Sequence, residues 1–109
     1  MVTQGELKLD RLVWTYWAAN APAGLITGYK DEQDGVMIEH IVIFPGQSAG
    51  ILVRMLRAAL LEAWEREYAY VALAIPHNRP PGLLALAERM GFEPYETDDR
   101  AVWFVRYRP

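Results

Sequence analysis

Residues 46–50 form a short run of small residues between an apolar stretch that ends at Pro45 and a segment whose apolar residues recur at helical spacing. A strand that leads through a glycine-bearing turn into a helix builds a place for an anion. The first amides of the helix have no partner inside it, and the helix dipole adds partial positive charge. Glycine at the turn lets a phosphate approach the backbone. Ordinary strand-to-helix connections share this pattern, so the turn alone leaves both interpretations open.

Glu39 is a carboxylate within residues 36–44, a run that is otherwise apolar apart from His40. Because an unpaired carboxylate is costly to bury, its presence needs a reason. A chemical reason is that a carboxylate can take a proton from a reacting group, directly or through one water. A structural reason is that Glu39 pairs with an arginine or lies on a wet face of the strand. Alternation along a strand places His40 on the opposite face from Glu39.

Three strands are expected to lead up to this turn. They are rich in β-branched and aromatic residues, which favours strands, and they span residues 12–18, 24–30 and 36–44. Residues 7–19 also suit a helix, because their apolar positions fit a 3.6-residue period. Residues 31–35 are typical of a hairpin turn in which Gly35 can adopt a positive φ. The third strand is expected to be central and covered on both faces.

A helix of about five turns is expected after Ser48, which is a good N-cap residue. Residues 68–75 are then predicted to form a strand parallel to the preceding one. Pro80 and Pro81 open a second helix, which Gly91 ends. Two strands make a closing hairpin: residues 92–97 and 101–108. The order βββ-α-β-α-ββ predicts an α/β protein with a mixed sheet and helices on its faces.

Length and composition exclude several classes of protein. The 109 residues predict a single domain, residues 1–109. Without cysteine, disulfides and thiolate metal sites are ruled out, and no metal is expected. A net charge of −3 without a basic face argues against nucleic acid. The N-terminus lacks the apolar core of a signal peptide, and no apolar run reaches the roughly 18 residues that span a membrane, so a cytoplasmic location without a membrane partner is expected.

This order of elements, with these motifs in place, resembles the GNAT superfamily of acetyl-CoA-dependent N-acetyltransferases. The resemblance is strongest over residues 24–92. Val42-Ile43-Phe44-Pro45 matches the end of the family's fourth strand near V-x-P, and Gln47-Ser48-Ala49-Gly50-Ile51-Leu52 matches its Q/R-x-x-G-x-G/A turn. Ala87-Glu88-Arg89-Met90-Gly91-Phe92 looks like the family's helix end and its Gly-Phe step.

The resemblance implies transfer of an acetyl group from acetyl-CoA to a primary amine, either a small molecule or a peptide. Two neighbouring parallel strands would splay apart, and the pantetheine arm would extend the sheet in the gap by bonding to the backbone at Val42 and Phe44. Glu39 matches the position of a proposed general base, and a backbone amide near Phe44 would stabilise the oxyanion. The pyrophosphate would rest on amides of six residues: Gln47, Ser48, Ala49, Gly50, Ile51 and Leu52.

Three positions depart from the family pattern and motivate a second hypothesis. Leu52 stands where the family prefers glycine or alanine, Pro80 where it places an asparagine, and Ala87 where many members place a tyrosine that protonates the leaving thiolate. The alternative is a GNAT-like domain that has lost catalysis and acts as an interaction or assembly module. Tyr95 is a candidate substitute acid, and His77 a candidate residue at the mouth of the cleft.

One alternative fold and one mode of assembly remain open at this stage. A small ACT-like or ferredoxin-like regulatory domain shares the α/β layering but has a different strand order. Aromatic residues fall on both faces of the strand at residues 12–18 and recur at Trp103 and Phe104. Exposed aromatic side chains often mark an interface, which suggests a homodimer through sheet edges.

Overall fold

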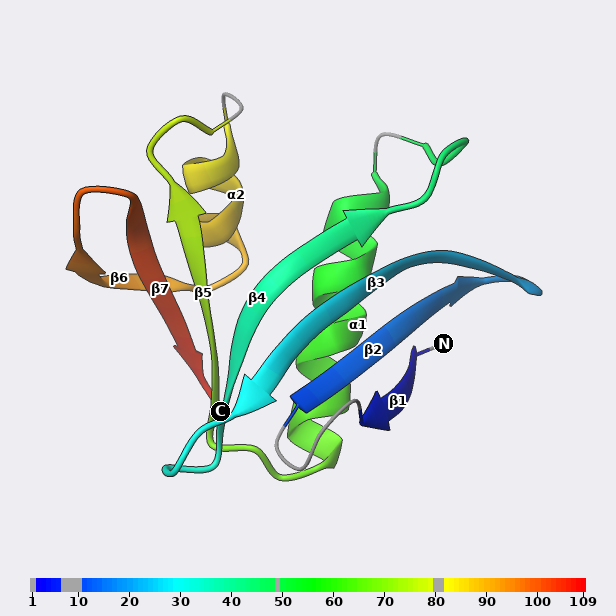
Figure 1. Cartoon of the computed structure of the whole chain (residues 1–109), viewed down its shortest axis with the longest axis horizontal. Coiled ribbons are helices and arrows are strands. Elements are labelled where there is room, and N and C mark those ends of the chain that lie inside the picture. Colours follow the sequence, from blue (N-terminus) through cyan, green and yellow to red (C-terminus); the bar gives the residue numbers. More distant parts are fainter. Residues whose placement is uncertain (1, 7–10, 49, 80–81) are drawn as a thin grey trace.

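A computed structural model describes residues 2–6, 11–48, 50–79 and 82–109 (Figure 1). Seven strands form one mixed sheet in the spatial order β1-β2-β3-β4-β5-β7-β6. The elements are β1 (Val2–Glu6), β2 (Arg11–Ala18), β3 (Ala21–Lys30), β4 (Gly35–Ile43), α1 (Ile51–Glu65), β5 (Tyr70–Pro76), α2 (Leu83–Arg89), β6 (Glu93–Thr97) and β7 (Ala101–Tyr107). The predicted α/β class is confirmed, and this strand order leaves no room for the ACT-like or ferredoxin-like alternative.

The N-terminal strand β1 was not predicted from the sequence. Its five residues, VTQGE, include one β-branched apolar residue, so neither propensity nor alternation marks a strand. Its extended state comes from antiparallel pairing with β2, where Gln4 lies opposite Trp14 and accepts a hydrogen bond from the indole. The helical alternative for residues 7–19 is wrong from Arg11 onward, and residues 7–10 lie outside the described residues.

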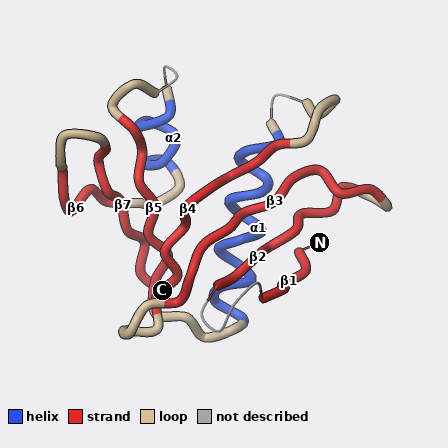
Figure 2. The backbone as a smooth tube through the Cα atoms, in the orientation of Figure 1, coloured by secondary structure: helices blue, strands red, loops and turns tan. Residues whose placement is uncertain are grey.

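Both helices pack on the same face of the sheet. Residues that lie opposite one another share a face, so the register groups Ile38 with Leu73 and Phe104. These three are buried in one cluster with Met55 of α1 and Ala87 of α2. Figures 1 and 2 show α1 lying behind β2, β3 and β4. The expectation that β4 is covered on both faces is therefore wrong, because no described helix lies on the other face.

We call that second side of the sheet the open face. Seven of its side chains are partly exposed; five of these are apolar or aromatic and two are threonines. It carries Val13, Thr15, Leu25, Thr27, Tyr29, Met37 and Trp103. Trp14 and Phe104, by contrast, face the helices and are each 2% exposed. Tyr29 and Trp103 therefore lie outside the hydrophobic core, on the open face.

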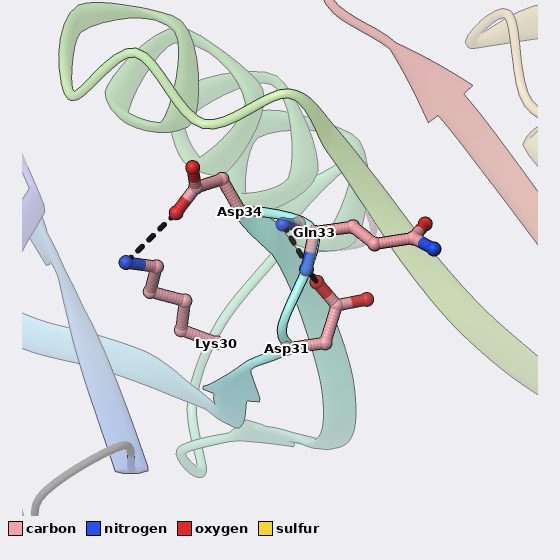
Figure 3. A network of polar contacts seen from close by, with 5 residues as sticks. Lys30, Asp31, Gln33 and Asp34 are labelled. Carbon is pink, nitrogen blue, oxygen red and sulfur yellow. Dashed lines mark hydrogen bonds and ion pairs between the residues drawn. The ribbon is translucent and has the colours of Figure 1, made fainter.

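The hairpin between β3 and β4 is fixed by Asp31 (Figure 3). Its Oδ1 accepts hydrogen bonds from the amides of Gln33 and Gly35, each at 2.9 Å. The positive φ falls on Asp34, at 62°, and not on Gly35 as expected. Gly35 is required for a different reason: the Tyr70 ring packs on it, and an added Cβ would lie 2.0 Å from that ring.

The second helix ends as expected. Gly91 has φ 86°, its amide bonds to the carbonyl of Glu88, and the Phe92 amide bonds to the carbonyl of Ala87. This pair of bonds satisfies the last carbonyls of α2 and directs Phe92 into the core. Pro80 and Pro81, which were expected to open the helix, lie outside the described residues. Within the described part of the chain, neither helix is long and apolar enough to cross a bilayer.

Candidate functional site

The neighbouring parallel strands β4 and β5 separate part of the way along their length. They pair from Gly35 opposite Tyr70 to Ile38 opposite Leu73, and the pairing stops there. β4 nevertheless continues to Ile43 and β5 to Pro76. Figure 1 shows the two strands diverging toward the end of the sheet where α1 begins. The splayed pair that the family resemblance implied is confirmed.

A β-bulge at Glu39 lies where the strands part. Gly28 lies opposite Ile38 and Thr27 lies opposite His40, so Glu39 is an extra residue on β4 with no partner on β3. The bulge interrupts the alternation of side chains along the strand. Glu39 and His40 consequently line the same cavity, and the expectation that they face opposite sides is wrong.

The cavity has a volume of about 240 Å³ and opens on the open face beside the start of the gap. It is lined by Tyr29, Met37, Ile38, Glu39, His40, Ala74 and Trp103. The register brings Trp103 opposite Ala74 and Tyr29 opposite Met37, which is how four strands contribute to one hollow. Sequence reasoning had considered Trp103 only as a possible interface residue and had not considered Tyr29. Only the pairing register of the strands brings Tyr29 and Trp103 to this cavity, and that register cannot be deduced from the sequence.

Glu39 forms an ion pair with Arg11 at the rim of this cavity. The Glu39 side chain is 35% exposed, and that of Arg11 is 43% exposed. The Arg11 guanidinium also lies over the Tyr29 ring, 5.2 Å from its centroid. The structural reason for Glu39, pairing with an arginine, is therefore confirmed. An exposed pair of this kind contributes little to stability and leaves the carboxylate reachable by a ligand. His40 Nδ1 lies 3.3 Å from Thr27 Oγ1.

The register decides which backbone groups of β4 face the gap. The Phe44 amide donates to the carbonyl of Ala23 at 3.0 Å, so this amide is directed at β3. The carbonyl of Val42 also points to β3, since a Cβ added to Gly24 would lie 2.5 Å from its oxygen. In an antiparallel ladder this direction alternates from residue to residue. The polar backbone groups of Ile41 and Ile43 therefore face the gap, in place of those expected at Val42 and Phe44.

The head of α1 has no side-chain cap. The N-cap residue is Gly50 and not Ser48 as expected. The Ser48 carbonyl accepts a bond from the Ile51 amide at 3.2 Å, which removes one amide of the expected anion cradle. No described residue accepts a bond from the Leu52 amide. The Leu52 side chain packs against the core cluster, away from the cradle. Gln47 is exposed, and Ala49 lies outside the described residues.

Arg54 also belongs to this helix head, although no sequence motif drew attention to it. Its Nη2 donates to Ser48 Oγ at 2.8 Å, and its Nη1 would lie 3.2 Å from a Cβ on Gly50. The guanidinium thus folds back over the turn and adds a cation to the helix dipole. The first turn of α1 contains no acidic residue that would neutralise this charge. The turn is electropositive and suits an anion.

The remaining candidates lie away from the cavity. His77 Nε2 lies 2.7 Å from the carbonyl oxygen of Asp98, and the His77 amide bonds to Arg100, which ties the loop after β5 to the closing hairpin. Tyr95 is 50% exposed on β6 and does not line the cavity. Ala87 is 4% exposed in the core. Among the described residues, no group of three or more potential ligands could hold a metal ion.

No protein-family model matches the chain, and no curated protein matches it in sequence. Solved structures do match in fold. An acetyltransferase of Bacillus subtilis in complex with CoA superposes with a TM-score of 0.77 at 15% identity, covering 99% of this chain and 98% of that one. The IAA acetyltransferase of Bacillus cereus gives 0.74 at 14% identity, over 91% of this chain and 79% of that one. A GNAT family acetyltransferase of Elizabethkingia anophelis with acetyl-CoA bound gives 0.74 at 15% identity, over 91% and 77%.

The fold of this chain is that of the GNAT acetyltransferases, as the sequence resemblance implied. The agreement with the Bacillus subtilis structure covers nearly the whole of both chains. Four strands, the crossover helix, the parallel strand and the closing hairpin are thus a known arrangement at this length. Function has to be argued from the site itself, because one fold supports many activities.

Proposed function

We propose that this protein is an acetyl-CoA-dependent N-acetyltransferase that moves an acetyl group to a primary amine. The observation that carries the proposal is the separation of β4 from β5 after Ile38, toward the end of the sheet where the uncapped head of α1 lies. Solved structures of this fold that hold CoA or acetyl-CoA support it. The site residues fit that cosubstrate: the gap offers backbone groups to an extended chain, and the helix head offers positive charge to a pyrophosphate.

Binding is divided between two parts of the site. Ile41 and Ile43 direct their polar backbone groups into the gap, where an amide-containing chain can pair with them as a strand would. At the other part, the Leu52 amide and the Arg54 guanidinium serve the pyrophosphate, together with the exposed turn at Gln47 and Ser48. Because Leu52 packs into the core, it does not obstruct this seat. One argument for a domain that has lost catalysis is thereby weakened.

Acetyl transfer to an amine requires a general base and a hydrogen-bond donor to the developing oxyanion. Bound in the gap, acetyl-CoA supplies a thioester whose thiolate leaves from a thiol of ordinary pKa near 8.5, so the alanine at position 87 is no obstacle. Glu39 lies where the gap opens, 35% exposed, and accepts the proton of the incoming ammonium directly or through one water. An amide facing the gap from Ile41 or Ile43 donates to the carbonyl oxygen on which negative charge develops.

A thermal-shift titration tests the binding step. Acetyl-CoA at about 100 times its Kd should add roughly 2.7 kcal/mol to the free energy of unfolding, a clear rise in Tm. The absence of any shift at millimolar acetyl-CoA would remove the cosubstrate and return the protein to the alternative of an interaction or assembly module. Acetate alone, which lacks the pyrophosphate, is the matched ligand control.

Glu39→Gln tests the chemical step. The amide keeps the size of the side chain but cannot accept the proton, so turnover of an amine should fall by about 100-fold or more while acetyl-CoA binding stays unchanged. Glu62→Gln is the matched control, since Glu62 also pairs with an arginine, Arg66, but lies on α1. Unchanged turnover in Glu39→Gln would remove Glu39 from the mechanism.

A further inference from the structure

The cavity at the start of the gap carries one negative and one positive group at its rim. Its described lining contains a single carboxylate, that of Glu39, and Arg11 is already paired with it. A polyamine would need several carboxylates, whereas this cavity offers only Glu39, whose charge is already balanced by Arg11. A simple alkylammonium would meet Glu39 with the Arg11 cation beside it, and like charges repel. A ligand that carries both charges matches both groups.

The walls of the cavity add the second part of the argument. Tyr29, Met37 and Trp103 offer aromatic and thioether surfaces on the open face. The volume of about 240 Å³ is small, below the range usual for drug-sized ligands. The space therefore suits one small molecule with an apolar body. Arg11 lies against Tyr29, which holds the guanidinium at the edge of this apolar wall.

Resting on the acetyltransferase function proposed above, we propose that the acceptor is a free α-amino acid with an apolar or aromatic side chain. Its carboxylate binds Arg11, its amino group lies at Glu39, and its side chain packs against the Tyr29 and Trp103 walls. Planar guanidinium groups suit carboxylates because they bind them in a bidentate manner. Arg11 is then the residue that selects an amino acid over an amine without a carboxylate.

An α-amino group also suits the base that is present. The α-amino group of a free amino acid is less basic than an alkylamine such as that of lysine, whose pKa is roughly 10.4, so an exposed carboxylate can deprotonate it more readily. In the transfer, the amine nitrogen forms a bond to the acetyl carbon and the carbon–sulfur bond breaks. The ammonium first loses one proton to Glu39, which passes it on to solvent, so that the neutral amine can attack. The nitrogen loses a second proton to solvent as the amide forms, and the departing thiolate takes up one proton from solvent. The products are an N-acetylamino acid and CoA.

A matched acceptor pair tests this assignment with the full-length protein and saturating acetyl-CoA. L-phenylalanine and phenethylamine share the same body and differ in the carboxylate, and spermidine serves as a polycation. Thiol release should give a kcat/KM for L-phenylalanine at least about tenfold above that for phenethylamine, with spermidine lower still. Equal or better use of phenethylamine or spermidine would overturn the assignment and leave an acetyltransferase of another specificity.

Arg11→Met tests the residue. The variant should raise KM for L-phenylalanine by about tenfold or more with little change in kcat, and it should leave phenethylamine unaffected or improved. Arg11→Lys, which keeps the charge, should restore part of the loss. Arg57→Met, on the exposed side of α1, is the control. An unchanged preference in Arg11→Met would exclude Arg11 from acceptor binding.

Two outcomes separate this inference from the function beneath it. If acetyl-CoA binds but no amino acid of the apolar class is turned over or bound, the inference is wrong and the cosubstrate site stands. Binding is read by a further rise in Tm when L-phenylalanine is added to the CoA-bound protein. If acetyl-CoA itself does not bind, both the inference and the proposed function fall together.

Discussion

Arg54 occupies a position that the helix itself disfavours. A cation in the first turn opposes the positive end of the helix dipole, and α1 has no acidic residue there to compensate. The side chain folds back to Ser48 instead of extending into solvent. A charge held against the local electrostatic preference is explained if an anion binds beside it. The sequence pattern had drawn attention to the turn but not to this arginine three residues into the helix.

Arg54→Met should separate binding from stability. Acetyl-CoA affinity is expected to fall about tenfold, and the loss should be larger at low salt because the contact is electrostatic. The free energy of unfolding should change by no more than about 1 kcal/mol, since the lost hydrogen bond to Ser48 is offset by removal of an unfavourable charge. Calorimetric titration at two salt concentrations checks this, with Arg57→Met as the matched control. Equal affinity in wild type and variant would show that the pyrophosphate binds elsewhere.

The Tyr70 hydroxyl on β5 donates a hydrogen bond to the carboxylate of Asp31. Burial raises the pKa of Asp31, but hydrogen bonds from the Tyr70 hydroxyl and the amides of Gly35 and Gln33 outweigh it and hold that pKa below its ordinary value. Burial and the same hydrogen bond raise the pKa of Tyr70. The pair ties the β3–β4 hairpin, which leads into the bulge at Glu39, to β5.

Tyr70→Phe should therefore destabilise the fold by about 1–2 kcal/mol near neutral pH. Because the folded pKa of Asp31 lies below its unfolded value of about 3.9, this stabilisation is present above that value and is lost as pH falls through the folded pKa. The difference between wild type and variant should shrink as the pH drops below about 4. Denaturant unfolding at several pH values measures it. Tyr107→Phe, at a side chain that is 65% exposed, is the control and should show no such dependence.

At the scale of elements, the sequence predicted the order and class of structure well and the register not at all. The strand at residues 36–44 and the long helix behind the turn were predicted because apolar periodicity follows from burial, although the helix begins after Gly50 and not after Ser48. The bulge at Glu39 leaves no such signal, because one extra residue on β4 is defined only by its pairing with β3. The direction of each backbone group near the gap depends on that same pairing. The backbone groups that face the gap are therefore those of Ile41 and Ile43, one residue away from the expected Val42 and Phe44.

Amide exchange can test this alternation directly. The amides of Val42 and Phe44, which face β3, should exchange slowly, whereas those of Ile41 and Ile43, which face the gap, should exchange rapidly without ligand. Adding CoA should protect Ile41 and Ile43 and leave the other two unchanged. Residue-resolved hydrogen exchange by NMR is the measurement. Slow exchange at Ile41 and Ile43 without ligand would mean that the gap is closed in solution.

At the scale of the whole molecule, the sheet has two unlike faces. Both described helices cover one face, while Val13, Leu25 and Met37 lie on the other. The sequence could not distinguish these cases, because β4 is apolar at successive positions whether or not a second layer covers it. The same asymmetry leaves the cavity beside Glu39 accessible. The homodimer through sheet edges remains a prediction, and it would have to leave that cavity reachable.

Two isosteric substitutions measure how different the faces are. Val71→Thr places a hydroxyl at a side chain that is 1% exposed on the helix-covered face, and it should lower the free energy of unfolding by about 1–3 kcal/mol. Val13→Thr makes the identical change at a partly exposed position on the open face, where water satisfies the hydroxyl, and should stay within about 0.5 kcal/mol. Chemical denaturation at two protein concentrations gives both values. A large, concentration-dependent loss in Val13→Thr would instead show that a second copy of the chain covers the open face in solution.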